Sequence, residues 1–178
     1  MVVWATDKLN TAAGAYDLLA RAVRAEWDMD ALPELDRAGD GKPFFFKFPQ
    51  HQFNLSHSGN YALCALDVRP VGADIQIIKD GWRAGLPGRV CSPGELVWLE
   101  GQPERWRAFA LLWAMKEARV KYAGTGLRVG IREISVPLPA PGQGLYLHEG
   151  LWFRIYAGGD WMAAVCGETP PPEHIIWK

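Results

Sequence analysis

The fold is best read from the stretch WAMKEARVKYAGTGL, residues 113–127. This stretch closes a longer run, from about residue 103 to 123, in which apolar residues recur at the spacings of three and four that an amphipathic helix requires. Gly124 ends the run, and glycine readily adopts the left-handed conformation found at helix ends. We therefore predict a long helix over 103–123, followed by a Gly124-Thr125-Gly126 loop.

Two charged residues continue the apolar stripe of this helix toward its C-terminal end. The stripe consists of Trp106, Phe109, Ala110, Trp113 and Val120. Glu117 and Lys121 share its face, which would normally contact the core. They could form a surface pair that contributes only ~0.3–0.5 kcal/mol, and the helix alone favours that interpretation. The aromatic stripe, and the second cation Lys116 beside Glu117, favour a functional site instead.

A second polar pair interrupts an apolar run that reads as a strand over 71–78. Asp74 and Gln76 are two residues apart, so they lie on one face of the strand, and Ala73 and Ile75 lie on the other. A polar face that contacts water would explain the pair, and the strand alone favours this. The alternative is a site for a hard cation, because Mg²⁺ binds a few protein oxygens and completes its shell with water and phosphate oxygens.

Two further polar segments precede this strand. Ser56-His57-Ser58-Gly59 lies at the end of a strand, and its hydroxyls and imidazole could donate to a phosphate. A serine hydrolase is a poor alternative, because the sequence lacks the G-x-S-x-G turn. Gly41-Lys42-Pro43 reads as a turn that could present a lysine to a phosphate.

The remaining elements indicate an α+β fold. We predict a helix over 11–27, a short strand at 44–46, and a strand over 61–66 that is the antiparallel neighbour of 71–78. Ser92 to Glu95 has the form of a helix capping box. Further strands are predicted at 131–136, 144–148, 151–156 and 161–166. The order suggests two α+β halves, residues 1–77 and 78–178.

Composition narrows the class of protein. The chain has 178 residues, a formal net charge of -1 and three Cys. Nothing in this balance points to nucleic acid or to an anionic membrane surface. The Cys residues are widely spaced, so reduced thiols are expected and a catalytic Cys is not. We expect a cytoplasmic protein, because no signal peptide and no run of 18 apolar residues is present.

Four blocks together resemble the 4′-phosphopantetheinyl transferases of the Sfp type, and the chain looks like a short member of that family. The blocks are Gly41-Lys42-Pro43, Phe53 to Gly59, Val71 to Gln76, and the opening stretch from Trp113 to Leu127. The last has the pattern W-x-x-K-E-A-x-x-K-x-x-G-x-G-L, which is highly specific. The resemblance covers roughly residues 10–168.

The resemblance implies a transferase with two similar halves packed as a pseudo-dimer. Such an enzyme moves the 4′-phosphopantetheine arm of coenzyme A to a serine of an apo acyl or peptidyl carrier protein. Mg²⁺ assists and 3′,5′-ADP is released. The implied metal ligands are Asp74 and Glu117, with Gln76 directly or through a water. The implied catalytic residues are Glu117, Lys121 and His57. The implied coenzyme-binding residues are Lys42, Pro43, Ser56, His57, Asp74, Lys116 and Lys121, with Lys42 and Ser56 near the adenosine 3′-phosphate.

Two departures from the family pattern bear on these expectations. Relatives often have Glu at the position of Gln76, and Asn10 replaces an Arg at the entry to the first helix. Lys8 is the only cation before Arg21, so a weaker affinity for coenzyme A is expected. A non-catalytic module that binds coenzyme A or a carrier protein is therefore the main alternative, and a metal-dependent phosphohydrolase is a more distant one. The family architecture implies a monomer, with carrier docking expected on 79–92.

Overall fold

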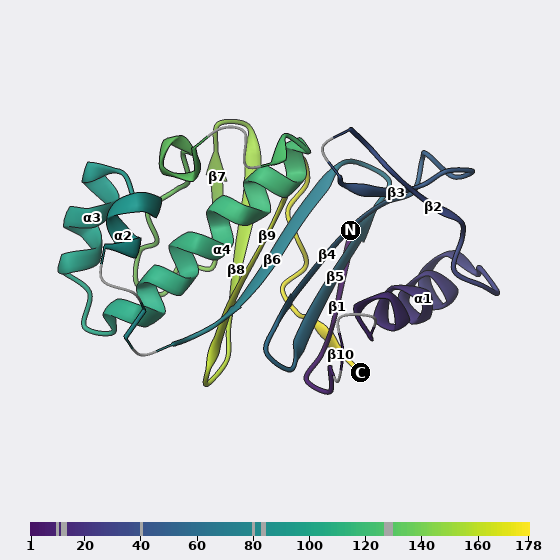
Figure 1. The fold of residues 1–178 in the computed structure, drawn as a ribbon, viewed down its shortest axis with the longest axis horizontal. Coiled ribbons are helices and arrows are strands. Elements are labelled where there is room, and N and C mark those ends of the chain that lie inside the picture. The colour runs from purple at the N-terminus through teal and green to yellow at the C-terminus, as the bar shows by residue number, and fades with distance from the viewer. Residues whose placement is uncertain (10, 12–13, 40, 80, 83–84, 127–129) are drawn as a thin grey trace.

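Two four-stranded sheets meet along one edge and form the framework of the described chain (Figure 1). The computed structural model describes residues 1–9, 11, 14–39, 41–79, 81–82, 85–126 and 130–178. The fold is mixed α+β, as predicted. The first sheet holds most of the N-terminal strands, and the second holds the later ones together with the longest helix.

The first sheet has the strand order β10-β1-β5-β4. Its strands are β1 (Val2–Thr6), β4 (Gln52–Ser58), β5 (Tyr61–Asp67) and β10 (Ile176–Trp177). Helix α1 (Gly14–Trp27) packs on this sheet through its buried residues, which recur at helical spacing: Ala15, Leu18, Leu19, Ala22 and Val23. A two-stranded ribbon of β2 (Leu35–Arg37) and β3 (Pro43–Phe45) lies beside it.

The second sheet has the order β6-β9-β8-β7 and is antiparallel throughout. Its strands are β6 (Val71–Ile77), β7 (Leu145–His148), β8 (Leu151–Ala157) and β9 (Trp161–Gly167). Helix α4 (Arg105–Ala123) crosses one face of it (Figure 1). The shorter helices are α2 (Leu86–Val90), α3 (Pro93–Glu100) and the 3₁₀ turn η2 (Ile131–Glu133).

Three apolar clusters hold these layers together. One fills the space between α1 and the first sheet, and another lies between α4 and the second sheet. The third lies between the opposite faces of the two sheets and includes Val3, Leu63, Ala65, Ala73, Ile75, Ala163 and Val165. β6 therefore turns Ala73 and Ile75 to this middle cluster, which confirms the predicted alternation and leaves Asp74 on the side of α4.

The long helix and its end agree with prediction. Predicted over 103–123, α4 begins at Arg105, and Gly124 follows it in the left-handed conformation with φ 64. The Ser92–Glu95 capping box forms as expected, with both of its reciprocal hydrogen bonds. The helix predicted over 11–27 is described from Gly14 to Trp27, and part of its start lies outside the described residues. The strands predicted at 144–148, 151–156 and 161–166 are confirmed.

Two predicted features of the sheets are wrong. β5 and β6 are not hydrogen-bonded neighbours, because β5 pairs with β1 and β4 while β6 pairs with β9. Residues 131–136 do not form a strand: they contain η2, and side chains of α4 bind several of their carbonyl groups. In both places, side chains take the backbone hydrogen bonds that a neighbouring strand would otherwise take.

The predicted boundary between the two halves differs from the division that strand pairing indicates. A boundary at residue 77 leaves β6 in the first half, whereas the pairing of β6 with β9 assigns it to the second sheet. A division by sheets would fall in the β5–β6 connection. The similarity of the halves stays a prediction. None of the helices in the described residues is both long and apolar enough to cross a membrane.

Candidate active site

A close approach between α4 and β6 creates the candidate site. Gly72 on β6 lies directly under the backbone of α4, and a Cβ placed there would be 1.9 Å from the carbonyl oxygen of Ala118. A side chain at this position would therefore push the helix away. Since glycine has none, the last turns of α4 can bring Lys121 down to Asp74.

Asp74 is the centre of the polar contacts at this crossing. Its side chain is buried, and its Oδ1 accepts hydrogen bonds from Lys121 Nζ at 2.6 Å and from Ser56 Oγ at 2.6 Å. Its Oδ2 accepts a hydrogen bond from Gln76 Nε2 at 2.7 Å. A buried carboxylate is stable only when it is paired and hydrogen-bonded, and these partners supply both conditions. Lys121 also donates to the carbonyl of Ala73 at 3.3 Å.

Glu117 is the second carboxylate of the site. It lies one helical turn before Lys121 and is half-buried. Burial raises the pKa of Glu117 above its ordinary value, and the nearby charge of Asp74 raises it further, while Lys121 lowers it. The two carboxylates are thus close enough to repel each other. A cation between them would relieve that repulsion.

Lys42 reaches the same site from the turn before β3. Its Nζ donates to the carbonyl oxygen of Lys121 at 2.6 Å, with longer contacts to the carbonyls of Val71 and Tyr122. The ammonium thus lies at the C-terminal end of α4, where carbonyl groups and the helix dipole favour a cation. Lys42 consequently links the β2–β3 ribbon to the C-terminal end of α4.

One cavity gathers several of the predicted residues. It has a volume of about 240 Å³ and is lined by Gly41, Lys42, Pro43, Asn54, Leu55, Glu117, Val120, Lys121, Gly124 and Gly126. A neighbouring cavity of about 330 Å³ shares Lys42, Pro43 and Gly124. The larger cavity of about 570 Å³ lies at the other end of α4, around Trp98, Arg107 and Met162. We place the site at the 240 Å³ cavity, because Glu117, Lys42 and Lys121 line it and Lys121 is bonded to Asp74.

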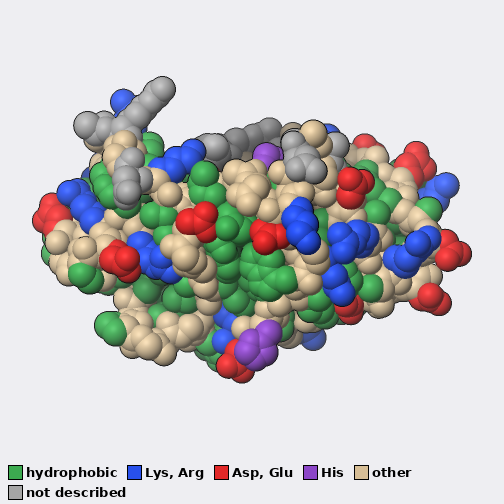
Figure 2. Space-filling model, turned by 90° about the horizontal axis from the view of Figure 1, so that it is seen from below, with side chains coloured by type: hydrophobic (Ala, Val, Ile, Leu, Met, Phe, Trp, Pro, Cys, Tyr) green, Lys and Arg blue, Asp and Glu red, His purple; other side chains and the backbone are tan. Residues whose placement is uncertain are grey.

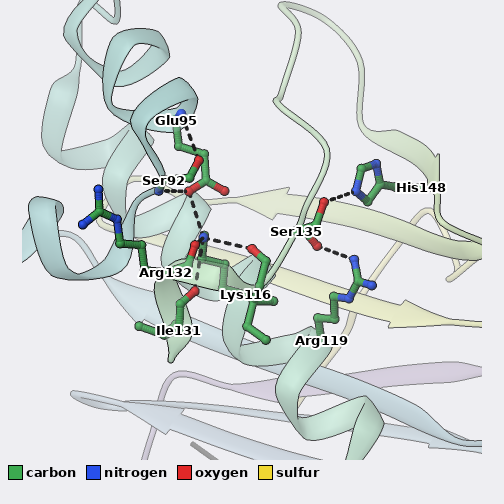
Figure 3. A network of polar contacts seen from close by, with 9 residues as sticks. Ser92, Glu95, Lys116, Arg119, Ile131, Arg132, Ser135 and His148 are labelled. Atoms are coloured by element: carbon green, nitrogen blue, oxygen red, sulfur yellow. Dashed lines mark hydrogen bonds and ion pairs between the residues drawn. The ribbon is translucent and has the colours of Figure 1, made fainter. Parts of the chain in front are cut away.

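Lys116 does not point into this cavity. Its ammonium is fully buried and lies 2.8 Å from Glu95 Oε2, and it also donates to the carbonyls of Ile131, Arg132 and Ile134 (Figure 3). Glu95 is the capping-box residue of α3 and accepts from the Ser92 amide as well. This full set of protein acceptors argues against the phosphate contact predicted for Lys116. The arrangement instead ties α3 and the 131–134 segment to α4.

Ser56 and His57 point to different sides of β4. Ser56 is buried and bonds to Asp74, which is not the exposed position expected of a residue near the adenosine 3′-phosphate. His57 alternates with it and is exposed, on the side of the strand that also carries Leu55. Leu55 lines the 240 Å³ cavity, and so does Asn54, which lies on the same side of the strand as Ser56. A contact between His57 and a phosphate therefore stays a prediction, as does the contact proposed for Ser56.

Several residues shape the site through contacts that were not predicted from the sequence. Asn54 and Ser58 bond to β6 beside Ser56, and Glu95 neutralises Lys116. The alternation of polar residues in Asn54-x-Ser56-x-Ser58 was a visible signal, since three polar side chains on one face of a buried strand need partners. For Glu95, the sequence indicated only its role in the capping box.

The segment 79–92 contributes less exposed apolar surface than expected for carrier docking. Trp82 packs against Phe109 and Trp113, with ring centroids at 4.7 and 5.4 Å. Val90 is buried, and Leu86 packs on the same cluster. These apolar residues therefore stabilise the protein's own core. Docking on this segment stays a prediction, and residues 80, 83 and 84 lie outside the described part of the chain.

The cysteines do not resemble catalytic thiols. Cys64, Cys91 and Cys166 are free and buried. Burial raises the pKa of Cys91 to about 11 and that of Cys166 to about 12, so the reactive thiolate is scarce at neutral pH. This agrees with the expectation from their spacing.

A basic pocket lies at the start of α1, away from Glu117. It has a volume of about 350 Å³, and its lining includes Lys8, Arg21 and Lys178 together with Asp17. Figure 2 shows several Lys and Arg side chains close together on the side of the first sheet. Lys8, the lone early cation in the sequence, is thus joined here by two others. Asn10, the departure from the family pattern, lies outside the described residues.

The model of the 4′-phosphopantetheinyl transferase superfamily matches residues 70–166. The chain belongs to the 4′-phosphopantetheinyl transferase superfamily. The matched region begins at β6 and ends within β9, so it contains Asp74, Glu117 and Lys121. The match therefore covers both β6 and α4, the two elements whose close approach forms the site.

Curated relatives of this transferase superfamily agree. The chain is 36% identical over 137 residues to a 4′-phosphopantetheinyl transferase of Bacillus subtilis, an alignment of 73% of this chain and 61% of the relative. It is 36% identical over 143 residues to the transferase Sfp of Bacillus subtilis strain 168, covering 76% and 63%. With the transferase AcpT of Salmonella typhi the identity is 42% over 112 residues, covering 60% and 55%. The chain thus spans about three-fifths of the length of these relatives.

Proposed function

We propose that this chain transfers the 4′-phosphopantetheine arm of coenzyme A to a serine of an apo carrier protein and releases 3′,5′-ADP. The observation that carries the proposal is the convergence of two carboxylates, Asp74 and Glu117, with the Lys121 ammonium beside a cavity that Lys42 also lines. Fixed cations suit phosphoryl transfer, and so does a carboxylate pair that can hold a metal ion, because the transition state spreads negative charge over oxygens.

Mg²⁺ suits the oxygen atoms available at this site. Mg²⁺ is commonly held by one or two carboxylates, and substrate phosphates complete its shell. No group of three or more His, Cys, Asp or Glu gathers among the described residues, but Asp74 and Glu117 with the amide oxygen of Gln76 supply that smaller set. Burial and the nearby charge of Asp74 raise the pKa of Glu117, and a bound cation would favour its charged form. Bound there, the metal would neutralise charge on the coenzyme's pyrophosphate.

The chain's own residues would then act on the proton and on the leaving group. The carrier serine oxygen forms a bond to the phosphorus that carries pantetheine, and the bond from that phosphorus to the bridging oxygen breaks. Glu117 accepts the serine proton, directly or through a water, since a carboxylate with a raised pKa is a better base. Lys121 is held next to Asp74 and stabilises the departing 3′,5′-ADP oxygen.

One contact supports a second candidate, a module that binds coenzyme A or a carrier protein without catalysis. Gln76 donates its amide hydrogen to Asp74, which lowers the need of this carboxylate for a cation. In this case the fold would be retained and the metal-dependent step lost.

Intact mass spectrometry of apo acyl and peptidyl carrier proteins separates the candidates. Each carrier is incubated with the chain, coenzyme A and Mg²⁺. A mass gain of one phosphopantetheine arm supports transfer. No gain with intact coenzyme A supports the binding module, and no gain with cleaved coenzyme A supports phosphohydrolysis.

A further inference from the structure

The edges of the two sheets are joined by side chains rather than by a backbone ladder. β4 and β6 are edge strands that run side by side (Figure 1). The amide hydrogens of β6 are accepted by Asn54 Oδ1 at 3.0 Å, Ser56 Oγ at 3.3 Å and Ser58 Oγ at 3.1 Å. Their donors are the amides of Ala73, Ile75 and Ile77, in that order. We call these three contacts the β4–β6 seam.

Ser56 differs from the other two residues of the seam. While its Oγ accepts from the Ile75 amide, its hydroxyl donates to Asp74 Oδ1 at 2.6 Å. The hydroxyl hydrogen therefore has a fixed direction, set by the backbone of the same strand that carries Asp74. Since Ser56 is 6% exposed and Asp74 is 2% exposed, water does not compete strongly for this contact.

The carboxylate of Asp74 is oriented by this contact and by its other two partners. Lys121 Nζ shares Oδ1, and Gln76 Nε2 takes Oδ2. The side chain of Lys121 is long and partly exposed, and that of Gln76 is partly exposed too. Ser56 has the shortest side chain of the three and is held by the seam, so it is the most rigid of Asp74's partners.

We propose that Ser56 is a positioning residue that fixes the orientation of the Asp74 carboxylate for cation binding. This inference rests on the proposed function, because that function is what assigns cation binding to the site. The orientation of the Asp74 carboxylate follows from the contacts alone. Partners that orient a metal ligand typically change metal affinity by about 10- to 100-fold when they are removed. The proposal therefore predicts a change in metal affinity first, and a change in turnover only as its consequence.

The seam supplies its own matched control. Ser56→Ala removes one seam contact and the Asp74 contact, whereas Ser58→Ala removes one seam contact alone. Both variants leave one amide of β6 without a side-chain acceptor, so both should lose some thermal stability. Only Ser56→Ala should change the behaviour of Asp74. Ser56→Thr keeps the hydroxyl and serves as the conservative replacement.

The test is Mn²⁺ binding to the full chain, measured by electron paramagnetic resonance with coenzyme A absent. We expect Ser56→Ala to weaken Mn²⁺ binding by about 10-fold or more, Ser58→Ala to stay within about twofold, and Ser56→Thr to retain most of the affinity. Equal affinity in Ser56→Ala and wild type, or an equal loss in Ser58→Ala, would overturn the proposal. An absence of Mn²⁺ binding in the wild type would overturn it as well. If Ser56→Ala does not fold, Ser56→Cys replaces it, with a weaker donor of similar size.

Mn²⁺ binding does not require transfer, so a wild-type chain that binds Mn²⁺ but modifies no carrier would refute the proposed function alone.

Discussion

Asp74 has more side-chain partners than a surface carboxylate needs, and this is the clearest feature of the site at the scale of single residues. Ser56, Gln76 and Lys121 all donate to it. The sequence alone favoured a strand face in water. The structure instead buries Asp74 on the side of α4, and a buried charge of this kind must be compensated by its neighbours.

Glu117 should lower the stability of the metal-free protein at neutral pH. Burial raises the pKa of Glu117, so its charged form is disfavoured in the folded state compared with the unfolded state. The resulting penalty is fully present above the raised pKa, and it disappears as pH falls below the ordinary carboxyl pKa. Glu117→Gln should therefore raise Tm at pH 7 in the presence of EDTA, and the gain should shrink toward pH 4.

Thermal melts of Glu117→Gln and wild type across this pH range test the prediction. The exposed Glu173 is a suitable control position, and Glu173→Gln should show no pH-dependent difference of this kind. A gain in Tm for Glu117→Gln that grows on acidification would contradict the sign of the pKa shift.

Lys121→Ala should reduce turnover more than coenzyme affinity. Lys121 is held at Asp74 rather than in open solvent, so its charge is preorganised for the leaving group. We expect kcat to fall by about 10²-fold or more, with a smaller change in the dissociation constant of coenzyme A. Steady-state kinetics together with equilibrium titration make the distinction. A loss confined to affinity would exclude the leaving-group role.

Lys116→Met should destabilise the fold strongly. The substitution leaves Glu95 as a buried carboxylate without its cation (Figure 3), and breaking a buried pair in this way typically costs about 3–5 kcal/mol. Lys47→Met, at an exposed pair with Glu34, should change stability by less than about 1 kcal/mol. Urea denaturation measures both.

The double variant Lys116→Met/Glu95→Gln should recover part of the lost stability, because no unpaired charge then remains. A stable Lys116→Met protein with impaired coenzyme binding would favour the phosphate contact that the family resemblance implies for this lysine.

At the scale of elements, the contact between α4 and β6 determines the geometry of the site. The helix was predictable from its apolar spacing and from Gly124, and the strand from its apolar run. Their crossing was not, because the role of Gly72 depends on a backbone that is distant in sequence. From the sequence, only the resemblance to the transferase family indicated that Asp74 and Glu117 belong to one site.

Gly72→Ala should weaken this contact. The added methyl would lie 1.9 Å from the Ala118 carbonyl and 2.6 Å from the Tyr122 amide nitrogen. Relief requires the backbones to separate, for which overpacking costs of about 1–3 kcal/mol are typical, and Lys121 would move away from Asp74. Gly94→Ala on α3 meets no atom within 4 Å and should be neutral or slightly stabilising. Thermal melts and activity of the two variants compare them directly, and equal behaviour would disprove the role of Gly72.

The two elements that were mispredicted have a common physical cause. The β4–β6 seam and the 131–135 segment both satisfy backbone groups with side chains, from Asn54, Ser56 and Ser58 in one case and from Lys116 and Arg119 in the other. Local patterns of apolar residues report burial, but they do not report which partner takes a backbone hydrogen bond. Antiparallel pairing of β5 with β6 and a strand at 131–136 were therefore reasonable from the sequence and wrong in the structure.

At the scale of the whole molecule, the site lies where the two sheets meet. β4 contributes Ser56, β6 contributes Asp74, and α4 contributes Glu117 and Lys121, so neither sheet holds the site by itself. The mixed α+β class could be read from the order of elements, whereas the assignment of β6 to the second sheet depended on long-range pairing. The superfamily match over residues 70–166 covers the part that carries the carboxylates.

The central claim is that Asp74 and Glu117 belong to the active site of a phosphopantetheine transferase. Its most direct test is the rate at which intact mass spectrometry records the phosphopantetheine gain on an apo carrier protein, for wild type, Glu117→Gln and Glu173→Gln with saturating coenzyme A and Mg²⁺. We predict transfer by wild type and Glu173→Gln at similar rates, and a rate lower by about 10²-fold or more for Glu117→Gln. Transfer by Glu117→Gln at the wild-type rate, or no transfer by the wild type to any apo carrier, would contradict the claim.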